Sequence, residues 1–328
     1  MRGKAVSLLS GGLDSTLATK VVLNQGIEVI GLHFSMPWGC CDRSAAYTAA
    51  KRFGIPIMVF KMKEDYLEVI KRPKYGYGRA MNPCVDCRIH MYGKAKRYME
   101  SIDASFLITG EVLGQRPKSQ MRDSLKTIER ECGLDRRILR PLSAHVLDPT
   151  IPEEEGIVDR SKLLGISGRS RQMQMALASE EGIRNYPTPA GGCLLTDEGF
   201  SRRVKDLFDH SGDLTIEDME LLRIGRHFRM NPAVKLIVGR NESENDLLAY
   251  YGTTRPLFQP VNFPGPSTLV VGKAGPESER VVASLTFRYG SLPRNGKTEE
   301  VVLSFQEGER RFQTSDLLGQ DALEKMRV

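Results

Sequence analysis

The sequence has no run of about 18 consecutive apolar residues, and its first residues enter an apolar strand pattern without a charged, then apolar, leader. It therefore predicts neither a membrane span nor a secretion signal, and we expect a cytoplasmic protein that does not act at a membrane. Internal repeats and low-complexity segments are also missing. With 328 residues, of which 40% are hydrophobic, the chain is long enough for two globular domains.

The six cysteines lack the even, regular spacing of a secreted disulfide scaffold. In a reducing cytosol we expect them to serve metal, cluster or sulfur chemistry instead of disulfides. Cys40 and Cys41 are adjacent and point to different sides, so we expect these two and Cys132 to be structural. Cys84, Cys87 and Cys193 remain as candidates for chemistry.

The sequence has little excess of one charge over the other: 47 Lys and Arg against 41 Asp and Glu give a formal net charge of only +6. Residues 1–212 contain 32 Lys and Arg against 25 Asp and Glu, whereas residues 213–328 contain 15 against 16. The basic excess lies in the first part, where two clusters could follow a nucleic-acid backbone, although such runs are more often solvated faces. The clusters are Lys71, Arg72, Lys74, Arg79 and Arg88, and Arg116, Lys118, Arg122, Lys126 and Arg130.

The most informative stretch is Leu8 to Leu17, which reads Leu-Leu-Ser-Gly-Gly-Leu-Asp-Ser-Thr-Leu. An apolar run at 5–9 precedes it and an amphipathic stretch at 16–23 follows, which predicts a strand, a phosphate-sized loop and a helix. It is neither a Walker loop nor a dinucleotide fingerprint, because the required lysine or third glycine is missing.

Each polar residue of this loop has a use in binding phosphate. Gly11 and Gly12 allow the backbone to approach an anion, and amides at the helix start donate to it. Ser10 and Ser15 add hydroxyl donors. Asp14 is anionic in such a place, which is explained if it holds Mg²⁺ on the same phosphates. A glycine turn that binds nothing is the alternative.

The remaining pattern alternates strands and helices, which predicts an α/β fold with a doubly wound parallel sheet. Around residue 210 the character changes to shorter strands, so we expect a second, smaller α+β domain, with domains at 1–210 and 211–328. The expected strands of the first domain are 5–9, 28–34, 57–61, 106–109 and 138–140, and its helices 16–23, 45–53, 88–99, 169–179 and 197–208. The strands expected in the second are 234–238, 268–272, 281–289 and 300–305.

Two of the remaining cysteines, Cys84 and Cys87, form a Cys-x-x-Cys pair just before an expected helix. The third, Cys193, directly follows a glycine-rich loop at 185–192. A helix start favours thiolates electrostatically. A structural zinc site needs four ligands, and no fourth is evident. An iron–sulfur cluster on three cysteines fits better. A persulfide carrier with a resolving thiol, or three unrelated buried cysteines, are the alternatives.

Three resemblances extend this interpretation. The Ser-Gly-Gly-x-Asp-Ser string resembles the loop of the PP-loop ATP pyrophosphatases, which adenylate a carbonyl oxygen with ATP. Residues 88–142, with Thr-Gly-Glu-Val-Leu-Gly-Gln from Thr109 to Gln115 and a later Ser-Gln pair, resemble the PP-loop domain of tRNA 4-thiouridine synthetases. Residues 4–56 resemble the tRNA 2-thiouridylases, and Cys84, Cys87 and Cys193 match the pattern of cluster-dependent tRNA thiolases.

The resemblance implies a tRNA uridine sulfurtransferase that uses ATP, Mg²⁺ and a [4Fe–4S] cluster, with 4-thiouridine slightly favoured over 2-thiouridine. It implies catalytic roles for Asp14 and the three cysteines, which would also hold magnesium and the cluster, respectively. Gly110, Gln115 and Ser119 would border ATP or the target base, and Phe34 to Met36 would lie beside adenine. Lys118 either neutralises phosphate or is an exposed lysine, and Trp38 either stacks on a base or packs.

The resemblance also names partners. We expect tRNA and a sulfur donor, either sulfide or a product of a cysteine desulfurase, and a homodimer is possible. Val234 to Leu248 resembles the Val-Gly-Arg-Asn core of the NFACT-R domain, an RNA-associated module, with a generic domain for stability or dimerisation as the alternative. Two other functions stay open: a PP-loop ligase or amidotransferase for a small molecule, and an RNA-binding protein regulated by nucleotide.

Overall fold

The computed structural model describes residues 3–38, 43–184, 186, 192–291, 298–305 and 308–328. It divides into two compact units, Met1–Asp197 and Glu198–Val328. Cys40, Cys41 and most of the loop expected at 185–192 lie outside the described residues. Within the part that is described, no helix is long and apolar enough to cross a bilayer.

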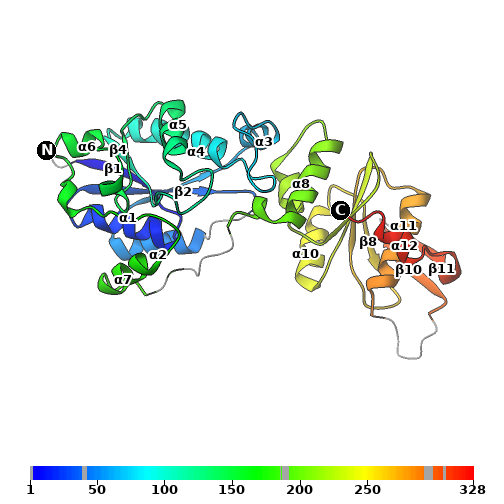
Figure 1. Cartoon of the computed structure of the whole chain (residues 1–328). Helices are drawn as coiled ribbons and strands as arrows, with labels where there is room; N and C mark the ends of the chain where they lie inside the picture. The colour runs from blue at the N-terminus through cyan, green and yellow to red at the C-terminus, as the bar shows by residue number, and fades with distance from the viewer. Residues whose placement is uncertain (1–2, 39–42, 185, 187–191, 292–297, 306–307) are drawn as a thin grey trace. The chain divides into compact units, whose positions relative to one another are not determined.

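The first unit is built on a five-stranded sheet of order β3-β2-β1-β4-β5, in which every pair of neighbours is parallel. The predicted α/β fold with a doubly wound sheet is confirmed, because helices α1, α2 and α7 cover one face and α4, α5 and α6 the other (Figure 1). The strands are β1 (Lys4–Leu8), β2 (Glu28–Ser35), β3 (Ile57–Lys61), β4 (Phe106–Ile108) and β5 (Ile138–Leu139). The helices are α1 (Leu13–Leu23), α2 (Arg43–Phe53), α3 (Asp65–Lys71), α4 (Cys84–Ser101), α5 (Arg122–Cys132), α6 (Ile151–Glu154) and α7 (Gln172–Glu180).

The strand order places a ligand-binding edge. From β1 the chain adds β2 and β3 on one side and then β4 and β5 on the other, so the direction of winding reverses between β1 and β4. In open parallel sheets, ligands bind beyond the carboxyl ends of the strands at such a reversal. The loops that follow β1 and β4 are therefore the segments that form a site.

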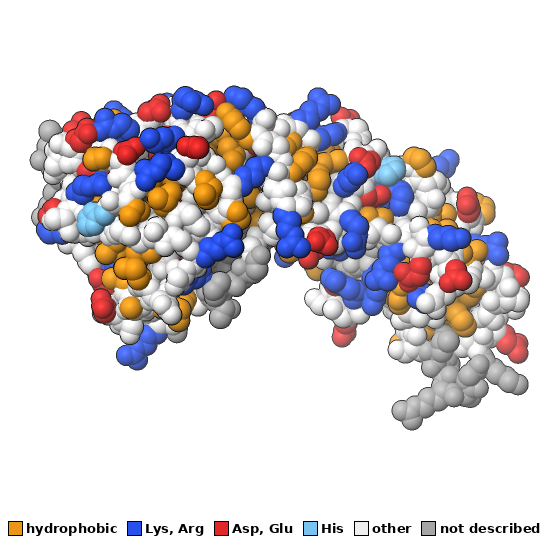
Figure 2. Space-filling view, in the orientation of Figure 1, with side chains coloured by type: hydrophobic (Ala, Val, Ile, Leu, Met, Phe, Trp, Pro, Cys, Tyr) orange, Lys and Arg blue, Asp and Glu red, His pale blue; other side chains and the backbone are white. Residues whose placement is uncertain are grey.

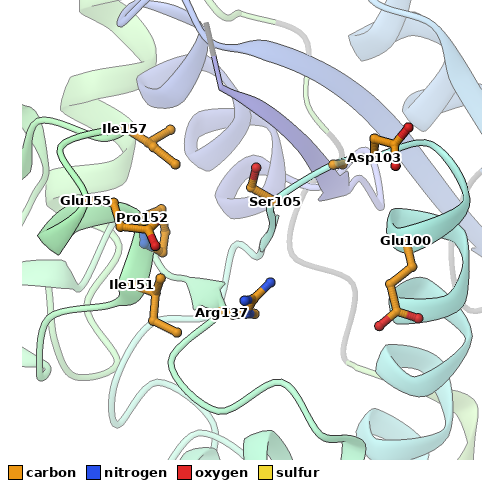
Figure 3. A pocket seen from close by; sticks show the side chains of 9 residues that line it. Glu100, Asp103, Ser105, Arg137, Ile151, Pro152, Glu155 and Ile157 are labelled. Carbon is orange, nitrogen blue, oxygen red and sulfur yellow. The ribbon is translucent and has the colours of Figure 1, made fainter. Parts of the chain in front are cut away.

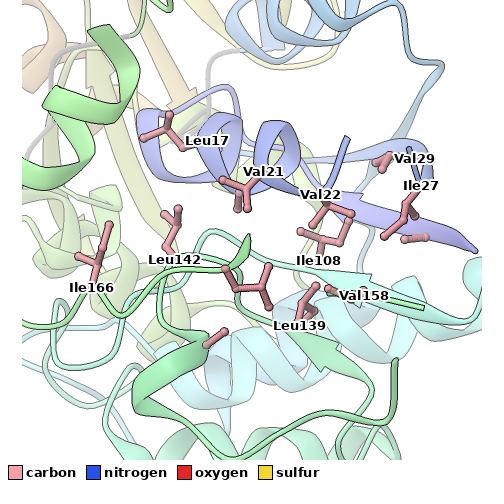
Figure 4. Close-up of a cluster of buried hydrophobic side chains, with 14 of the residues drawn as sticks. Leu17, Val21, Val22, Ile27, Val29, Ile108, Leu139, Leu142, Val158 and Ile166 are labelled. Carbon is pink, nitrogen blue, oxygen red and sulfur yellow. The ribbon is translucent and has the colours of Figure 1, made fainter. Parts of the chain in front are cut away.

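The core under this edge is apolar and joins α1 to the sheet. Leu17, Val21 and Val22 of α1 are buried against Ile108 and Leu139 of the sheet, as Figure 4 shows. Helix α1 begins at Leu13, one turn earlier than the sequence pattern predicted. Its first turn consequently contains Asp14 and Ser15, and the buried face behind them holds that turn in place.

The second unit is a six-stranded sheet of order β11-β10-β8-β9-β7-β6, antiparallel at every pairing, with helices packed on it. The expected α+β character is confirmed. Its strands are β6 (Arg226–Asn231), β7 (Val234–Val238), β8 (Leu257–Pro260), β9 (Thr268–Val271), β10 (Glu300–Phe305) and β11 (Gly308–Gln313). Its helices are α8 (Glu198–His210), α9 (Ile216–Leu221), α10 (Glu242–Tyr251), α11 (Pro276–Tyr289) and α12 (Gln320–Glu324).

The strand predicted at 281–289 is wrong, because these residues form most of helix α11. The β-branched residues Val281 and Val282 suggested a strand. In the structure they and Leu285 are buried in one core with the sheet, at helical spacing. The helix begins at Pro276, and the Ser278 hydroxyl and the Gly275 backbone amide cap its first turn at 2.9 Å. Proline at the first helical position was the signal in the sequence.

Helix α8 belongs to the second unit, although the sequence analysis placed it at the end of the first domain. The reason is a buried ion cluster. Asp206 of α8 accepts hydrogen bonds from Arg229 of β6, at 2.9 Å from Nε and from Nη2, and from Lys235 Nζ of β7 at 2.7 Å. These hydrogen bonds hold α8 against the sheet of the second unit. Because the paired residues are far apart in the sequence, no periodic sequence pattern could have predicted the contact.

The ion cluster predicts an acid-dependent loss of stability. Burial disfavours the charged form of Asp206, but the bonds from Arg229 and Lys235 outweigh it and lower its pKa to about 2. A carboxylate whose folded pKa lies below the unfolded value of about 3.9 stabilises the fold above that pH, and the contribution disappears as pH falls through the folded pKa. At neutral pH the contribution is about 2 kcal/mol.

We therefore expect Asp206→Asn to lower the unfolding free energy of the second unit by at least about 2 kcal/mol at pH 7, and the difference from wild type to shrink below about pH 4. Urea unfolding followed by far-ultraviolet circular dichroism measures it. The only tryptophan, Trp38, lies in the first unit, so its fluorescence identifies which transition is which. Asp209→Asn on the exposed side of α8 is the control. A difference that stays constant down to about pH 2.5 would contradict this role.

Candidate active site

Three segments of the first unit meet around the loop that follows β1. Gly11 has a φ of +81°, and a Cβ placed on it would lie 2.4 Å from the backbone nitrogen of Ala46 in α2. A Cβ on Gly110, just after β4, would lie 2.4 Å from the backbone nitrogen of Ser15. Side chains are excluded at both glycines, so the loops after β1 and β4 lie in direct backbone contact. The structure thus places Gly110 against the loop after β1, and the expectation that Gly110 borders ATP or the target base stays a prediction.

The serines of the loop close its turn. The Ser10 and Ser15 hydroxyls are 3.0 Å apart, and Ser10 Oγ accepts from the Gly12 amide at 3.3 Å. Ser15 Oγ donates to the Gly12 carbonyl at 3.0 Å. Amides in the first turn of a helix have no acceptor within the helix and carry the positive end of its dipole. The loop therefore presents donors to an anion at its mouth and has hydroxyls that can turn toward one.

Asp14 in the first turn of α1 has two distinct carboxylate oxygens. Its Oδ2 accepts hydrogen bonds from Gln115 Nε2 at 3.1 Å and from Arg171 Nη2 at 3.0 Å. Its Oδ1 is buried and has no hydrogen-bond partner among the described residues. A buried carboxylate oxygen without a donor fits the oxygen ligand that Mg²⁺ requires. The donor chemistry at Asp14 is therefore suited to a magnesium ion.

The segment after β4 only partly follows the expectations. Gln115 donates a hydrogen bond to Asp14, and Ser119 is buried. Lys118 has a positive φ of 70°, and its ammonium donates to the Gly76 carbonyl at 2.8 Å and to the Tyr77 carbonyl. Lys118 is therefore neither a solvated loop lysine nor directed at a phosphate. It ties the segment after β4 to the chain that leads into α4.

The aromatic residues expected near the nucleotide are packed. Phe34, near the end of β2, is buried edge-on against Phe60 with ring centroids 5.9 Å apart. Trp38 stacks on Tyr66 at 5.5 Å and is 1% exposed, so it packs and does not offer a face to a base. The predicted contact of Phe34 to Met36 with adenine stays a prediction through their backbone.

The cysteine pair starts helix α4. Cys84 is the first residue of the helix and its Sγ accepts from Asn82 Nδ2 at 3.1 Å. Cys87 Sγ accepts from the Tyr66 hydroxyl at 2.8 Å. Burial raises the pKa of the Cys87 thiol to about 12, Arg88 opposes this, and the neighbouring thiols of Cys193 and Cys84 add to it. The expectation that the helix start favours a thiolate is thus outweighed at Cys87 by desolvation.

The Cys193 thiol raises the pKa of Cys87, so it lies near the Cys84 and Cys87 pair although it is more than one hundred residues away in the sequence. Across the described ranges, no three or more His, Cys, Asp or Glu side chains are placed to hold one metal ion. The three thiols therefore do not form a single-ion site. Their residue type fits a cluster, in which each iron takes its own thiolate, and the donors to the sulfurs from Asn82 and Tyr66 are of the kind that tunes one.

A buried ion network joins helix α4 to the segment after β4 and to α5. Glu111, which follows Gly110, is 3% exposed and accepts from Arg88 Nε of α4 at 3.1 Å and from Arg140 Nε after β5 at 3.2 Å. Arg140 also pairs with Glu129 of α5. The sequence analysis did not identify Glu111 as part of the site. A charged residue between two apolar runs was the signal that could have indicated a buried ion pair. The sequence analysis missed Arg171 entirely, since nothing in the local sequence links that residue to Asp14.

Removal of the Glu111 charge should destabilise the first unit. Glu111→Gln removes the counter-charge of Arg88 and one of the two carboxylates that pair with the buried Arg140, which costs about 3 kcal/mol. Urea unfolding followed by the fluorescence of Trp38 measures it. Glu100→Gln on exposed α4 surface, where the nearest ammonium is that of Lys96 at 3.9 Å, is the control and should change the free energy of unfolding by less than about 0.5 kcal/mol. Equal midpoints for the two variants would contradict the network's role.

A pocket of about 460 Å³ lies at the opposite edge of the sheet. Figure 3 shows Arg137 among Glu100, Asp103 and Glu155, with Ile151 and Ile157 beyond. Ser105 in its lining precedes β4, so the pocket is at the amino ends of the strands. Because parallel sheets bind ligands at the carboxyl ends, its size does not make it the nucleotide site.

The basic residues of the first unit alternate with acidic ones on the face that Figure 2 shows. Figure 2 shows Lys and Arg side chains spread over its visible face, with Asp and Glu among them. Several are neutralised locally: Lys74 pairs with Glu131 at 2.6 Å and Lys126 with Asp148 at 2.9 Å. The charge alone therefore does not define a nucleic-acid path.

Two family models match the chain. Residues 1–151 match the model described as thiamine biosynthesis protein (ThiI), and residues 225–325 match the model described as NFACT protein RNA binding domain. The second match covers the sheet from β6 to β11 and includes the Val234–Leu248 segment. The two matches fall in different structural units, in agreement with the resemblances seen in the sequence.

Relatives with curated names include tRNA-specific 2-thiouridylases MnmA. That of Clostridioides difficile is 26% identical over 229 residues, 62% of this chain and 59% of that protein, and that of Natranaerobius thermophilus is 29% identical over 130 residues, 34% and 35%. The chain thus spans between 35% and 59% of these relatives. A solved 4-thiouridine synthetase–RNA complex with bound ATP is 20% identical, covers 67% of this chain and 52% of that one, and has a TM-score of 0.39, which supports no inference about this site.

Proposed function

We propose that this chain, which matches the ThiI model over residues 1–151 and the NFACT RNA-binding model over residues 225–325, is an ATP-dependent tRNA sulfurtransferase. The observation that carries the proposal is the meeting of two kinds of chemistry in one unit. Asp14 and the glycine loop can hold the phosphates of ATP, and Cys84, Cys87 and Cys193 share one neighbourhood. Glu111, which follows Gly110 in the chain, accepts a hydrogen bond from Arg88 of the helix that contains Cys84 and Cys87.

The reaction requires two steps in a fixed order. A uridine carbonyl has no leaving group, so its oxygen first attacks the α-phosphorus of ATP and pyrophosphate leaves. A sulfur nucleophile then adds to the activated carbon, AMP departs with the former carbonyl oxygen, and the base retains sulfur. Binding energy that fixes uridine and ATP together lowers the barrier of the first step.

In the first step, the amides of the first turn of α1 hold the leaving pyrophosphate, whose charge increases as the bond breaks. Asp14 would hold Mg²⁺ through Oδ1, and the ion would neutralise the same charge. Gly110 allows the loop after β4 to lie against this turn, so that Gln115 and Ser119 border the nucleotide or the base.

For the second step we assign the three cysteines to sulfur delivery. They would hold a [4Fe–4S] cluster, which when bound would supply an iron that accepts exogenous sulfide. The alternative assigns a persulfide to one cysteine and its resolution to another. The resemblance of residues 88–142 to the tRNA 4-thiouridine synthetases slightly favours 4-thiouridine as the product, whereas the 2-thiouridylase relatives favour 2-thiouridine. The second unit would bind the tRNA, and sulfide or a cysteine desulfurase would supply sulfur.

The test is AMP formation by the purified protein from ATP and Mg²⁺, with and without unmodified tRNA. The proposal expects AMP and pyrophosphate in equal amounts and stimulation by tRNA, together with thiouridine once sulfide is added. AMP formation without any effect of tRNA would favour a small-molecule ligase. ATP binding without AMP would favour an RNA-binding protein regulated by nucleotide, which the NFACT match makes the main competitor.

A further inference from the structure

We infer that Arg171 and Gln115 form a clamp that positions Asp14 for the cation of metal–ATP, and that Arg171 is its principal positioning residue. The inference rests on the proposed use of ATP at this loop. It goes further by assigning a role to a residue outside every motif of the sequence. It also explains why the two oxygens of Asp14 have different surroundings.

The clamp consists of two donors on one acceptor. Arg171 Nη2 lies 3.0 Å and Gln115 Nε2 lies 3.1 Å from the same oxygen, Asp14 Oδ2. The side chains of Arg171 and Asp14 are 24% and 15% exposed, so water competes weakly for the bond. A charged donor to a carboxylate makes a stronger and more directional bond than a neutral one. Arg171 therefore contributes more than Gln115 to fixing the carboxylate.

The backbone holds both donors in register before any ligand binds. Leu113 and Ser167 form a parallel bridge, and the Gly168 amide donates to the Leu113 carbonyl at 2.7 Å. The segment after β4 and the segment before α7 are thus joined two residues from Gln115 and three from Arg171. Helix α7, whose N-cap is Arg171, packs against α1, which contains Asp14. The backbone contacts between the two segments and the packing of α7 on α1 therefore position Arg171 and Gln115 next to Asp14 in the folded protein.

The clamp determines which oxygen is available. With Oδ2 occupied by two donors, a cation can take only Oδ1, which is buried and without a hydrogen-bond partner in the described part of the chain. A buried acceptor left without a donor costs free energy. That cost is recovered when a cation binds, so the arrangement is preorganised for a metal and not for a further hydrogen bond.

The test is equilibrium binding of Mn²⁺ to the protein saturated with α,β-methylene-ATP, an analogue that cannot be cleaved at the proposed bond, measured by electron paramagnetic resonance. Arg171→Ala should weaken Mn²⁺ binding by about 10- to 100-fold, the effect of losing one charged hydrogen bond. Arg171→Lys should recover most of the loss, because an ammonium still donates to Oδ2. Arg169→Ala, an exposed arginine in the same segment, is the matched control and should bind as wild type does. Thermal unfolding of each variant identifies any loss through misfolding.

A double-mutant cycle separates the clamp from a direct contact between Arg171 and phosphate. If Arg171 acts through Asp14, Arg171→Ala should have no further effect on Mn²⁺ binding in an Asp14→Asn background. The same loss in both backgrounds, no loss in either, or wild type that binds no Mn²⁺ with the analogue would overturn the clamp. Because the analogue is not cleaved, the result does not depend on tRNA thiolation. Intact metal binding with no thiolated tRNA would refute only the proposed function.

Discussion

Asp14→Asn should reduce AMP formation by on the order of 1,000-fold, while the protein stays folded and the cluster proposed for its cysteines is retained. Asparagine has nearly the same shape as aspartate but no charge, so the cation loses its anionic ligand and Arg171 loses its partner at 3.0 Å. The buried Oδ1 is the atom on which the effect depends. Chromatography of AMP and pyrophosphate in single-turnover experiments measures it.

The chain offers a matched control for this change. Asp123 is the second residue of α5, just as Asp14 is the second residue of α1, but it is exposed. Asp123→Asn should form AMP at the wild-type rate. If Asp14→Asn stays within about tenfold of wild type, the loop is not the place where ATP is cleaved, because loss of a catalytic electrostatic contact costs more than that.

The second large effect should appear at the cysteines and should separate the two half-reactions. Cys84→Ala, Cys87→Ala and Cys193→Ala should each lower thiouridine formation by on the order of 1,000-fold and leave tRNA-dependent AMP formation within about tenfold of wild type. The reason is that sulfur delivery follows adenylation and uses other atoms. Mass spectrometry of the tRNA product and AMP chromatography on the same samples measure both.

Cys132→Ala is the control for the cysteine variants. Cys132 is buried on α5, and its thiol donates to the Glu129 carbonyl at 3.4 Å, so its loss should affect stability but not sulfur transfer. Protein purified without oxygen should be brown, and Cys84→Ala should be colourless. Colourless wild type with stoichiometric zinc would contradict the cluster, and unchanged thiolation by all three variants would remove the cysteines from the mechanism.

The features that sequence predicted best depend on neighbouring residues. The strand, glycine loop and helix from 5 to 23 were evident because each element has a local pattern, and the parallel sheet followed from the alternation of such patterns. Asp14 stood out because an anion is unusual in a phosphate loop. In the structure the helix begins at Leu13 instead of residue 16, so Asp14 lies in its first turn.

The features that sequence missed depend on contacts between distant segments. Arg171 donates a hydrogen bond to Asp14, and Lys235 donates one to Asp206. Both contacts join residues far apart in the sequence, so the periodicity of the sequence does not predict them. The latter contact places α8 in the second unit. At 281–289 a strand was predicted from the β-branched residues, and the helix-start signal of Pro276 was not used. Valine favours strands locally, but here the valines lie in a helix that is buried on most sides, and burial is not visible in the local sequence.

The central claim is that the chain thiolates tRNA through ATP. It is tested most directly by mass spectrometry of the nucleosides in total tRNA from a strain that lacks this protein, compared with the same strain carrying wild type or Asp14→Asn. The account predicts that one thiouridine, 4-thiouridine or 2-thiouridine, is lost in the deletion, returns with wild type and stays absent with Asp14→Asn. An unchanged set of thionucleosides in the deletion strain would contradict it.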